Sequence, residues 1–206
     1  KNTEVFGWDA AVRGMRNPMN SWDKSDSEWD WWEDPSPINP CDELRFFVGE
    51  NDLKLVKTLS KAGNDHAKFL RFINVTVDIT APLYWWKEFD TYKVGTVANS
   101  CSTMHKIHSK EFTLDDFSHE HLVDTCEGGL LWYHTLNAII YALNDARNSY
   151  LETNQKRFWW MMIQLLPSSY NQKRTVQLNY QVLKQMYFAR RNHKLDEWHT
   201  LCDWML

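Results

Sequence analysis

Glycine, cysteine and long apolar runs are scarce in this chain, and each shortage excludes a class of protein. The 206 residues include 7 glycines and no Gly-x-Gly-x-x-Gly or P-loop pattern, so we expect no backbone cradle for phosphates. The 4 cysteines form no Cys-x-x-Cys pair, which excludes a zinc ribbon or a dithiol redox site and predicts reduced thiols. No run approaches the roughly 20 apolar residues that cross a bilayer, so no membrane partner is expected.

The charge balance is unlike that of a protein that coats nucleic acid. The chain has 23 basic and 27 acidic residues, a net charge of −4, whereas binding to a phosphate backbone requires a basic surface. No nucleic-acid partner is therefore expected, and small molecules or proteins fit better. Residues 1–8 do not combine a basic stretch with an apolar run, so the predicted location is the cytoplasm.

Aromatic residues are abundant, and their distribution divides the chain. They make up 15% of the residues and include 12 tryptophans, a content that favours a filled core or an oligomer interface over a ligand cage. Residues 20–37 alternate acids and rings and then break on prolines, which predicts an irregular, acidic, tryptophan-rich segment over residues 1–50. The regular domain is expected over residues 51–206.

Hydrophobic periodicity in that domain predicts helices and at least one strand. Residues Phe72–Ile79 alternate apolar and polar side chains, as a half-buried strand does. Helical spacing recurs from about 130 to 150, in Thr175–Phe188 and in Leu195–Met205. The expected fold class is α+β: a helix-rich domain with a small, mostly antiparallel sheet.

Histidines and amides offer two kinds of candidate site. The densest histidine cluster, made of His105, His108, His119 and His121, has no recognisable third and fourth zinc ligand, so surface histidines are favoured over a metal hydrolase. On a helix, Gln181, Gln185 and Arg190 would share one side, with Asn179 about half a turn away from Gln181. Amides can bind the edge of a flat heterocycle, and arginine offers a planar fork to an anion. A solvated helix face is the alternative.

Several segments resemble one family, the flavin-dependent thymidylate synthases. Residues 75–89 resemble the strand and helix before the family's signature, and residues 175–190 resemble its Thr-x-Asn-x-Arg-x-Leu stretch and the following Leu-Arg. Residues 63–66 are similar to an upstream Gly-x-x-His segment. The resemblance implies a homotetramer that uses FAD, NADPH and methylenetetrahydrofolate to methylate dUMP, with active sites between subunits. The binding slot for the planar ring system would form where the Lys93 stretch meets Arg190.

The resemblance also implies roles for individual residues. By matching position, Arg190 would lie against the pyrimidine and favour its polarised form. The implied flavin-binding residues are Lys93, Asn179, Gln185 and His66. The implied substrate-binding residues are Thr96, Asn99, Cys101, Thr103 and Gln181.

Departures from the family pattern leave two hypotheses open. The signature Arg-His-Arg-x-x-Ser-x-Asn-Glu-x-Ser-x-Arg is matched in chemical type only by Lys93 and Thr96, and the later arginine position holds Gln181. Each lost arginine fork removes a bidentate anion contact. The chain is therefore either a divergent enzyme acting on dUMP or a related pyrimidine nucleotide, or a non-catalytic relative that binds nucleotides or serves assembly.

Overall fold

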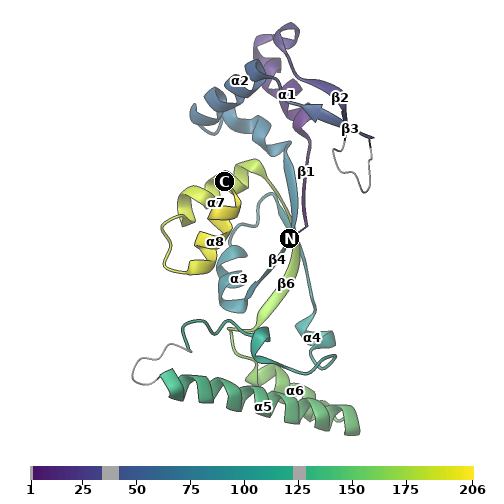
Figure 1. The fold of residues 1–206 in the computed structure, drawn as a ribbon, viewed down its shortest axis with the longest axis vertical. Coiled ribbons are helices and arrows are strands. Elements are labelled where there is room, and N and C mark those ends of the chain that lie inside the picture. The colour runs from purple at the N-terminus through teal and green to yellow at the C-terminus, as the bar shows by residue number, and fades with distance from the viewer. Residues whose placement is uncertain (1, 34–41, 123–128) are drawn as a thin grey trace. The chain divides into compact units, whose positions relative to one another are not determined.

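The computed structural model describes residues 2–33, 42–122 and 129–206 (Figure 1). The chain divides into two compact units, and each is described by itself. Among the described residues, unit 1 comprises residues 78–93 and 98–176, and unit 2 comprises residues 2–77, 94–97 and 177–206. Cys41 and Cys126, predicted to be reduced thiols, lie outside the described residues.

Helices dominate the described chain. The strands are β1 (Thr3–Phe6), β2 (Glu28–Glu33), β3 (Asp42–Phe47), β4 (Asn74–Pro82), β5 (Thr96–Ser100) and β6 (Asn171–Asn179). The α-helices are α1 (Trp8–Arg16), α2 (Glu50–Lys61), α3 (Leu83–Phe89), α4 (Thr103–Lys106), α5 (Gly129–Thr153), α6 (Lys156–Leu165), α7 (Tyr180–Arg190) and α8 (Asp196–Trp204). Short 3₁₀ helices are η1 (Asn17–Met19), η2 (Trp22–Lys24), η3 (His66–Arg71) and η4 (Leu114–Asp116).

The sheets are small. One has four strands in the order β1-β4-β6-β5, and the other pairs β2 with β3. Strand β1 runs antiparallel to β4 with Thr3 opposite Val77, and β2 runs antiparallel to β3. In β4, Val75 and Val77 are buried and Thr76 between them is partly exposed, which is the alternation the sequence predicts. The predicted α+β class is confirmed.

Unit 1 has its own core beneath a pair of long helices. Helix α5 contributes Leu136, Leu143 and Ala146, whose spacing places them along one side, and α6 contributes Met162. Helix α6 ends at Leu165, because the residue before a proline is disfavoured in helical geometry and Pro167 follows closely. No helix in the described part of the chain is long and apolar enough to cross a membrane.

Unit 2 contains regular structure where the sequence predicts an irregular segment. Helix α1 buries Ala11, Val12 and Met15 in a core that also includes Val56 and Ile73. Strands β1, β2 and β3 also fall within residues 1–50, so the expectation of irregularity is wrong. The physical reason is that these elements are short, and each is stabilised by distant partners rather than by its own periodicity. The domain boundary at residue 50 stays a prediction.

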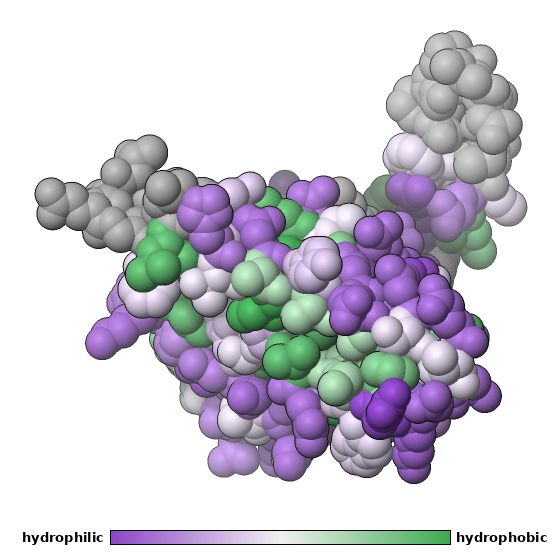
Figure 2. Space-filling view, turned by 90° about the horizontal axis from the view of Figure 1, so that it is seen from below, coloured by the Kyte–Doolittle hydropathy of each residue, from purple (hydrophilic) through white to green (hydrophobic). Residues whose placement is uncertain are grey.

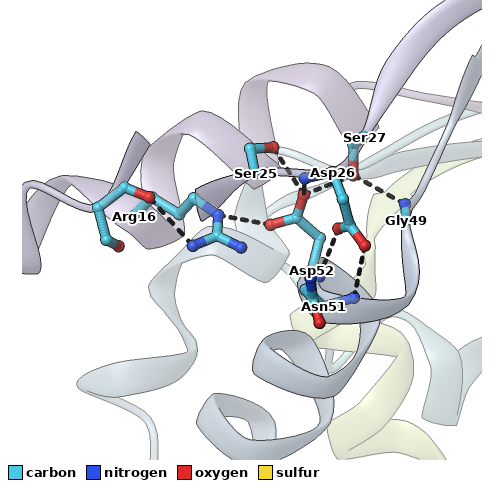
Figure 3. A network of polar contacts seen from close by, with 8 residues as sticks. Arg16, Ser25, Asp26, Ser27, Gly49, Asn51 and Asp52 are labelled. Carbon is cyan, nitrogen blue, oxygen red and sulfur yellow. Dashed lines mark hydrogen bonds and ion pairs between the residues drawn. The ribbon is translucent and has the colours of Figure 1, made fainter. Parts of the chain in front are cut away.

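A buried ion pair joins α1 to α2 within unit 2 (Figure 3). Arg16 Nε lies 2.6 Å from Asp52 Oδ1, and the two side chains are 5% and 0% exposed. The hydroxyls of Ser25 and Ser27 donate to the other carboxylate oxygen at 2.7 and 2.6 Å. Burial raises the pKa of Asp52, but hydrogen bonds from Ser27, Ser25 and Arg16 and the charge of Arg16 outweigh it and lower the pKa.

Asp26 lies between Ser25 and Ser27, and its side chain attaches this segment to the start of α2 (Figure 3). Its carboxylate accepts the backbone N–H groups of Asn51 at 2.9 Å and of Asp52 at 3.1 Å. These N–H groups belong to the first turn of α2 and have no partner inside the helix. A side chain at Gly49 would place its Cβ 2.3 Å from the backbone oxygen of Asp26, so the close approach requires glycine.

The predicted helix over Thr175–Phe188 is wrong in its first part. Residues up to Asn179 form β6, in which the buried Val176 and Leu178 alternate with less buried neighbours, and α7 begins at Tyr180. Asn179 ends the strand and caps the helix, because its Oδ1 accepts the N–H of Val182 at 3.1 Å. Asn179 is therefore not on the helix face expected from the sequence.

Candidate functional site

Candidate residues of unit 2 gather where β6 passes into α7. Gly95 has a φ of +75°, and a Cβ there would lie 2.8 Å from Nδ2 of Asn179. The 94–97 segment therefore lies directly against the Asn179 amide. The Thr96 hydroxyl is buried and has no hydrogen-bond partner in the described part of the chain. A buried polar group without a partner is costly, so this hydroxyl is an exception to the usual pairing of buried polar groups.

A cleft of about 430 Å³ lies between the η3 segment and α7, also within unit 2. Gln181 and Gln185 line it from α7 with the apolar Phe188, and Asn64 and Leu70 line it from the other side. Amide groups beside apolar walls can accept a flat ring with a polar edge. Of the upstream Gly63–His66 segment, Asn64 therefore lies at the amide side of α7, whereas His66 is exposed as the first residue of η3 and is not part of the cleft lining.

Gln181 is not a free surface amide. Its side chain is 7% exposed, and its Oε1 accepts a hydrogen bond from Arg71 Nε at 2.5 Å. Arg71 itself is exposed at the end of η3. Sequence reasoning missed Arg71, because 110 residues separate it from Gln181 and no local pattern connects the two.

Arg190 closes α7 beside a buried ring. Its guanidinium carbon lies 4.8 Å from the ring centre of Trp198, which is fully buried in α8. The ring of His193 packs edge-on to Trp198 at 6.2 Å. Stacking on a fixed ring restricts the guanidinium to a small range of positions, which is useful in a group that must meet a flat ligand.

The remaining predicted residues belong to unit 1. Lys93 is exposed ahead of β5, Asn99 is exposed within it, and Cys101 and Thr103 follow it. Cys101 and Thr103 line a cleft of about 480 Å³ together with Tyr170. Burial raises the pKa of Tyr170. Lys93 and Arg190 belong to different units, so the predicted slot between them stays a prediction.

Two ion pairs on β6 were not predicted. Arg174 Nη1 lies 2.7 Å from Asp90 Oδ1, and its guanidinium covers the Trp86 ring at 4.1 Å. Lys173 Nζ lies 3.0 Å from Asp78, whose pKa is lowered by a hydrogen bond from the Thr175 hydroxyl and by Lys173. Both cations are thus engaged in structural pairs. The alternation along β6 is the sequence signal that could have placed them on a strand.

The described residues contain no group of three or more side chains arranged to hold a metal ion. His119 instead contacts the Phe117 carbonyl oxygen through Nδ1 at 2.7 Å. His108 packs edge-on to the Tyr150 ring at 4.9 Å. Nδ1 of His119 is thus held by a backbone oxygen, whereas Nδ1 of His108 is buried without a hydrogen-bond partner among the described residues.

Comparisons with known proteins give a fold but no family match. The sequence matches no protein-family model and no curated protein. The structure is similar to that of flavin-dependent thymidylate synthase from Helicobacter pylori, crystallised with FAD and dUMP. In one such crystal structure the TM-score is 0.66 at 16% identity, over 98% of this chain and 91% of that one. In a second the TM-score is 0.65 at 15% identity, over 98% and 90%. The chain therefore has the fold of the flavin-dependent thymidylate synthases.

Proposed function

We propose that this chain reductively methylates dUMP or a related pyrimidine nucleotide, using FAD, NADPH and methylenetetrahydrofolate. The observation that carries the proposal is the fold likeness to an enzyme crystallised with FAD and dUMP, which spans 98% of the chain. Fold alone does not establish chemistry, so the proposal also rests on the residues at the β6–α7 junction.

The residues present fit a flat ring system with a polar edge. The buried Thr96 hydroxyl has no partner in the described regions, and the Asn179 amide lies beside Gly95, which a larger residue could not replace without displacing that amide. Asn179, Gln185, His66 and Lys93 are the proposed flavin-binding residues. When bound, reduced flavin would supply the hydride that converts a one-carbon unit to a methyl group.

Arg190 is the proposed catalytic residue. Methyl transfer to carbon 5 of a pyrimidine is favoured when negative charge develops on the ring and its carbonyl oxygens. A guanidinium fixed in advance at such an oxygen stabilises that charge without reorganising during the reaction. The Trp198 ring, 4.8 Å from the Arg190 guanidinium, holds the group in place. Thr96, Asn99, Cys101, Thr103 and Gln181 are proposed to contact the nucleotide.

Self-association, as a homotetramer, is part of the same proposal. Large apolar side chains are exposed along α5 and α6, among them Trp132 at 57%, Tyr141 at 76% and Met161 at 48%. Figure 2 shows hydrophobic residues gathered among hydrophilic ones on one face of the molecule. Exposed apolar patches of this kind are typical of interaction surfaces. Sedimentation velocity of the wild type and of Tyr141→Glu tests the assembly, because a buried carboxylate would shift the protein toward monomer.

A second candidate function is nucleotide binding or assembly without catalysis. The observation in its favour is the sequence's loss of the signature arginines, since Thr91 and Thr103 stand where the family pattern has arginine. Those positions provide hydroxyls, which bind phosphate more weakly than a guanidinium does.

Flavin binding and pyrimidine-dependent turnover separate the two candidates. Purified protein is examined for flavin absorbance, and FAD binding is measured by equilibrium dialysis. NADPH oxidation is then followed with and without dUMP in the presence of methylenetetrahydrofolate. Arg190→Ala is compared with Arg191→Ala, which removes the same charge from the next, exposed position.

The enzyme proposal predicts dUMP-dependent oxidation that Arg190→Ala abolishes and Arg191→Ala retains. Flavin or dUMP binding without turnover would support the non-catalytic candidate. A colourless protein that retains neither FAD nor dUMP would refute both.

A further inference from the structure

Arg71, at the end of η3, is an exposed cation that no sequence motif singles out. Its Nε donates to Gln181 Oε1 at 2.5 Å, and Gln181 is 7% exposed and thus held by its surroundings. Within residues 2–33, 42–122 and 129–206, no carboxylate forms an ion pair with Arg71. The guanidinium is exposed. One of its five N–H donors is used, and the positive charge is not neutralised by a neighbour.

The contact with Gln181 fixes the plane of the guanidinium. A guanidinium is flat, so a hydrogen bond at Nε restricts the directions in which the two terminal nitrogens can point. Those nitrogens carry the N–H groups that bind two oxygens of a phosphate or carboxylate in parallel. An arginine held in this way loses less conformational entropy on binding than a free surface lysine or arginine.

The surroundings of Gln181 favour a ligand that has both a ring and an anionic group. Gln181 lines the 430 Å³ cleft, where the side chains of Leu70 and Phe188 provide apolar walls and Gln185 adds an amide. Lys184 also lines the cleft, and its Nζ contacts the backbone oxygen of Ser60. Arg71 is the cation in direct contact with Gln181, and its guanidinium offers a planar fork that a lysine ammonium lacks.

We propose that Arg71 binds a phosphate group of the nucleotide or the flavin, and that it does so from the position where Gln181 places it. The inference rests on the function proposed above. The family pattern has an arginine where this chain has Gln181. Here the guanidinium comes from η3 and is held by the amide, so a cation missing from α7 is supplied by a different element. The shared ligand chemistry is a phosphate, either the monoester of dUMP or the diphosphate of FAD.

Equilibrium dialysis with dUMP and with FAD, measured separately, tests Arg71. Arg71→Ala is expected to weaken one of the two by about tenfold or more, since it removes a charge-assisted, two-point contact. The ligand that is affected identifies the phosphate. Arg71→Lys keeps the charge but not the fork and is expected to recover only part of the affinity. Lys68→Ala, a change of equal charge on the exposed side of η3, is the control and should bind both ligands as wild type does.

A double variant distinguishes phosphate binding by Arg71 from a purely structural role of its hydrogen bond between η3 and α7. Arg71→Ala with Gln181→Arg returns a guanidinium to the α7 position, and recovery of affinity to within about threefold of wild type supports the proposal. Weak binding by this double variant, with a wild-type melting temperature, overturns it. Unchanged affinity of Arg71→Ala for both ligands also overturns it. Wild-type protein that binds neither ligand refutes the proposed function instead.

Discussion

Removing the charge of Asp52 should destabilise unit 2 strongly, because it leaves a buried guanidinium without its partner. Arg16 is 5% exposed and lies 2.6 Å from Asp52, which is fully buried. Breaking such a pair from one side costs about 3–5 kcal/mol, since the remaining charge stays buried and uncompensated. Asp52→Asn keeps the size of the side chain and one acceptor oxygen for Ser25 and Ser27, so we expect about 3 kcal/mol, the low end of that range.

For a chain of this length, 1 kcal/mol lowers the melting temperature by roughly 2–4 °C, so Asp52→Asn should lower it by roughly 6–12 °C. Urea unfolding followed by circular dichroism gives the free energy directly. The control is Glu43→Gln. Glu43 pairs with Arg45 at 2.8 Å, but the two side chains are 58% and 45% exposed, and such surface pairs contribute about 0–1 kcal/mol.

A second change tests the cause of the destabilisation. Arg16→Met removes the buried guanidinium, so the double variant Arg16→Met with Asp52→Asn should be less destabilised than the sum of the two single variants. The reasoning is refuted if Asp52→Asn costs no more than Glu43→Gln, or if the two single effects simply add.

Three further predictions follow from the pKa of Asp52, from the close approach at Gly49 and from the Asn179 cap. The pKa of Asp52 is below its usual 3.8, so its stabilisation is complete above that value and is lost as pH falls through the folded-state pKa; acid titration should therefore destabilise wild type more steeply than Asp52→Asn. Gly49→Ala should cost about 1–3 kcal/mol by displacing Asp26 from the α2 start, whereas Gly14→Ala meets only the exposed Phe72 ring at 3.2 Å and should be better tolerated in urea unfolding. Asn179→Ala should cost about 1 kcal/mol through loss of the α7 cap, while Asn179→Asp keeps the accepting oxygen and should retain stability but bind FAD more weakly in dialysis.

Elements whose pattern is local could be predicted from the sequence. The alternation around Val75 and Val77 identified β4, and the apolar spacing of Leu136, Leu143 and Ala146 identified α5. In both cases the buried side of the element can be deduced from its own residues.

Elements that depend on distant partners could not be predicted in this way. In β6, Leu178 lies four residues before the apolar Val182 of α7, so the helical spacing of α7 extends backward in the sequence into the strand. Strand β2 alternates rings and acids, and its pairing with β3 sets Trp29 opposite Phe46. The partner that decides each case is many residues away, and neither periodicity nor composition reports it.

The candidate site shows the same division between local and distant information. Gln181, Gln185 and Arg190 lie on one helix, as the sequence predicts, whereas the donor that engages Gln181 comes from η3. The loss of an arginine from a motif therefore does not show that anion binding is lost, because an arginine on any element can place its guanidinium at the same point.

Anion binding then depends on whether the charge of that guanidinium is already neutralised by a carboxylate. Arg16 and Arg174 are paired with Asp52 and Asp90, and binding an anion would require breaking those pairs. The hydrogen bond from Arg71 to a neutral amide positions the group without cancelling its charge, so the attraction for a phosphate is retained.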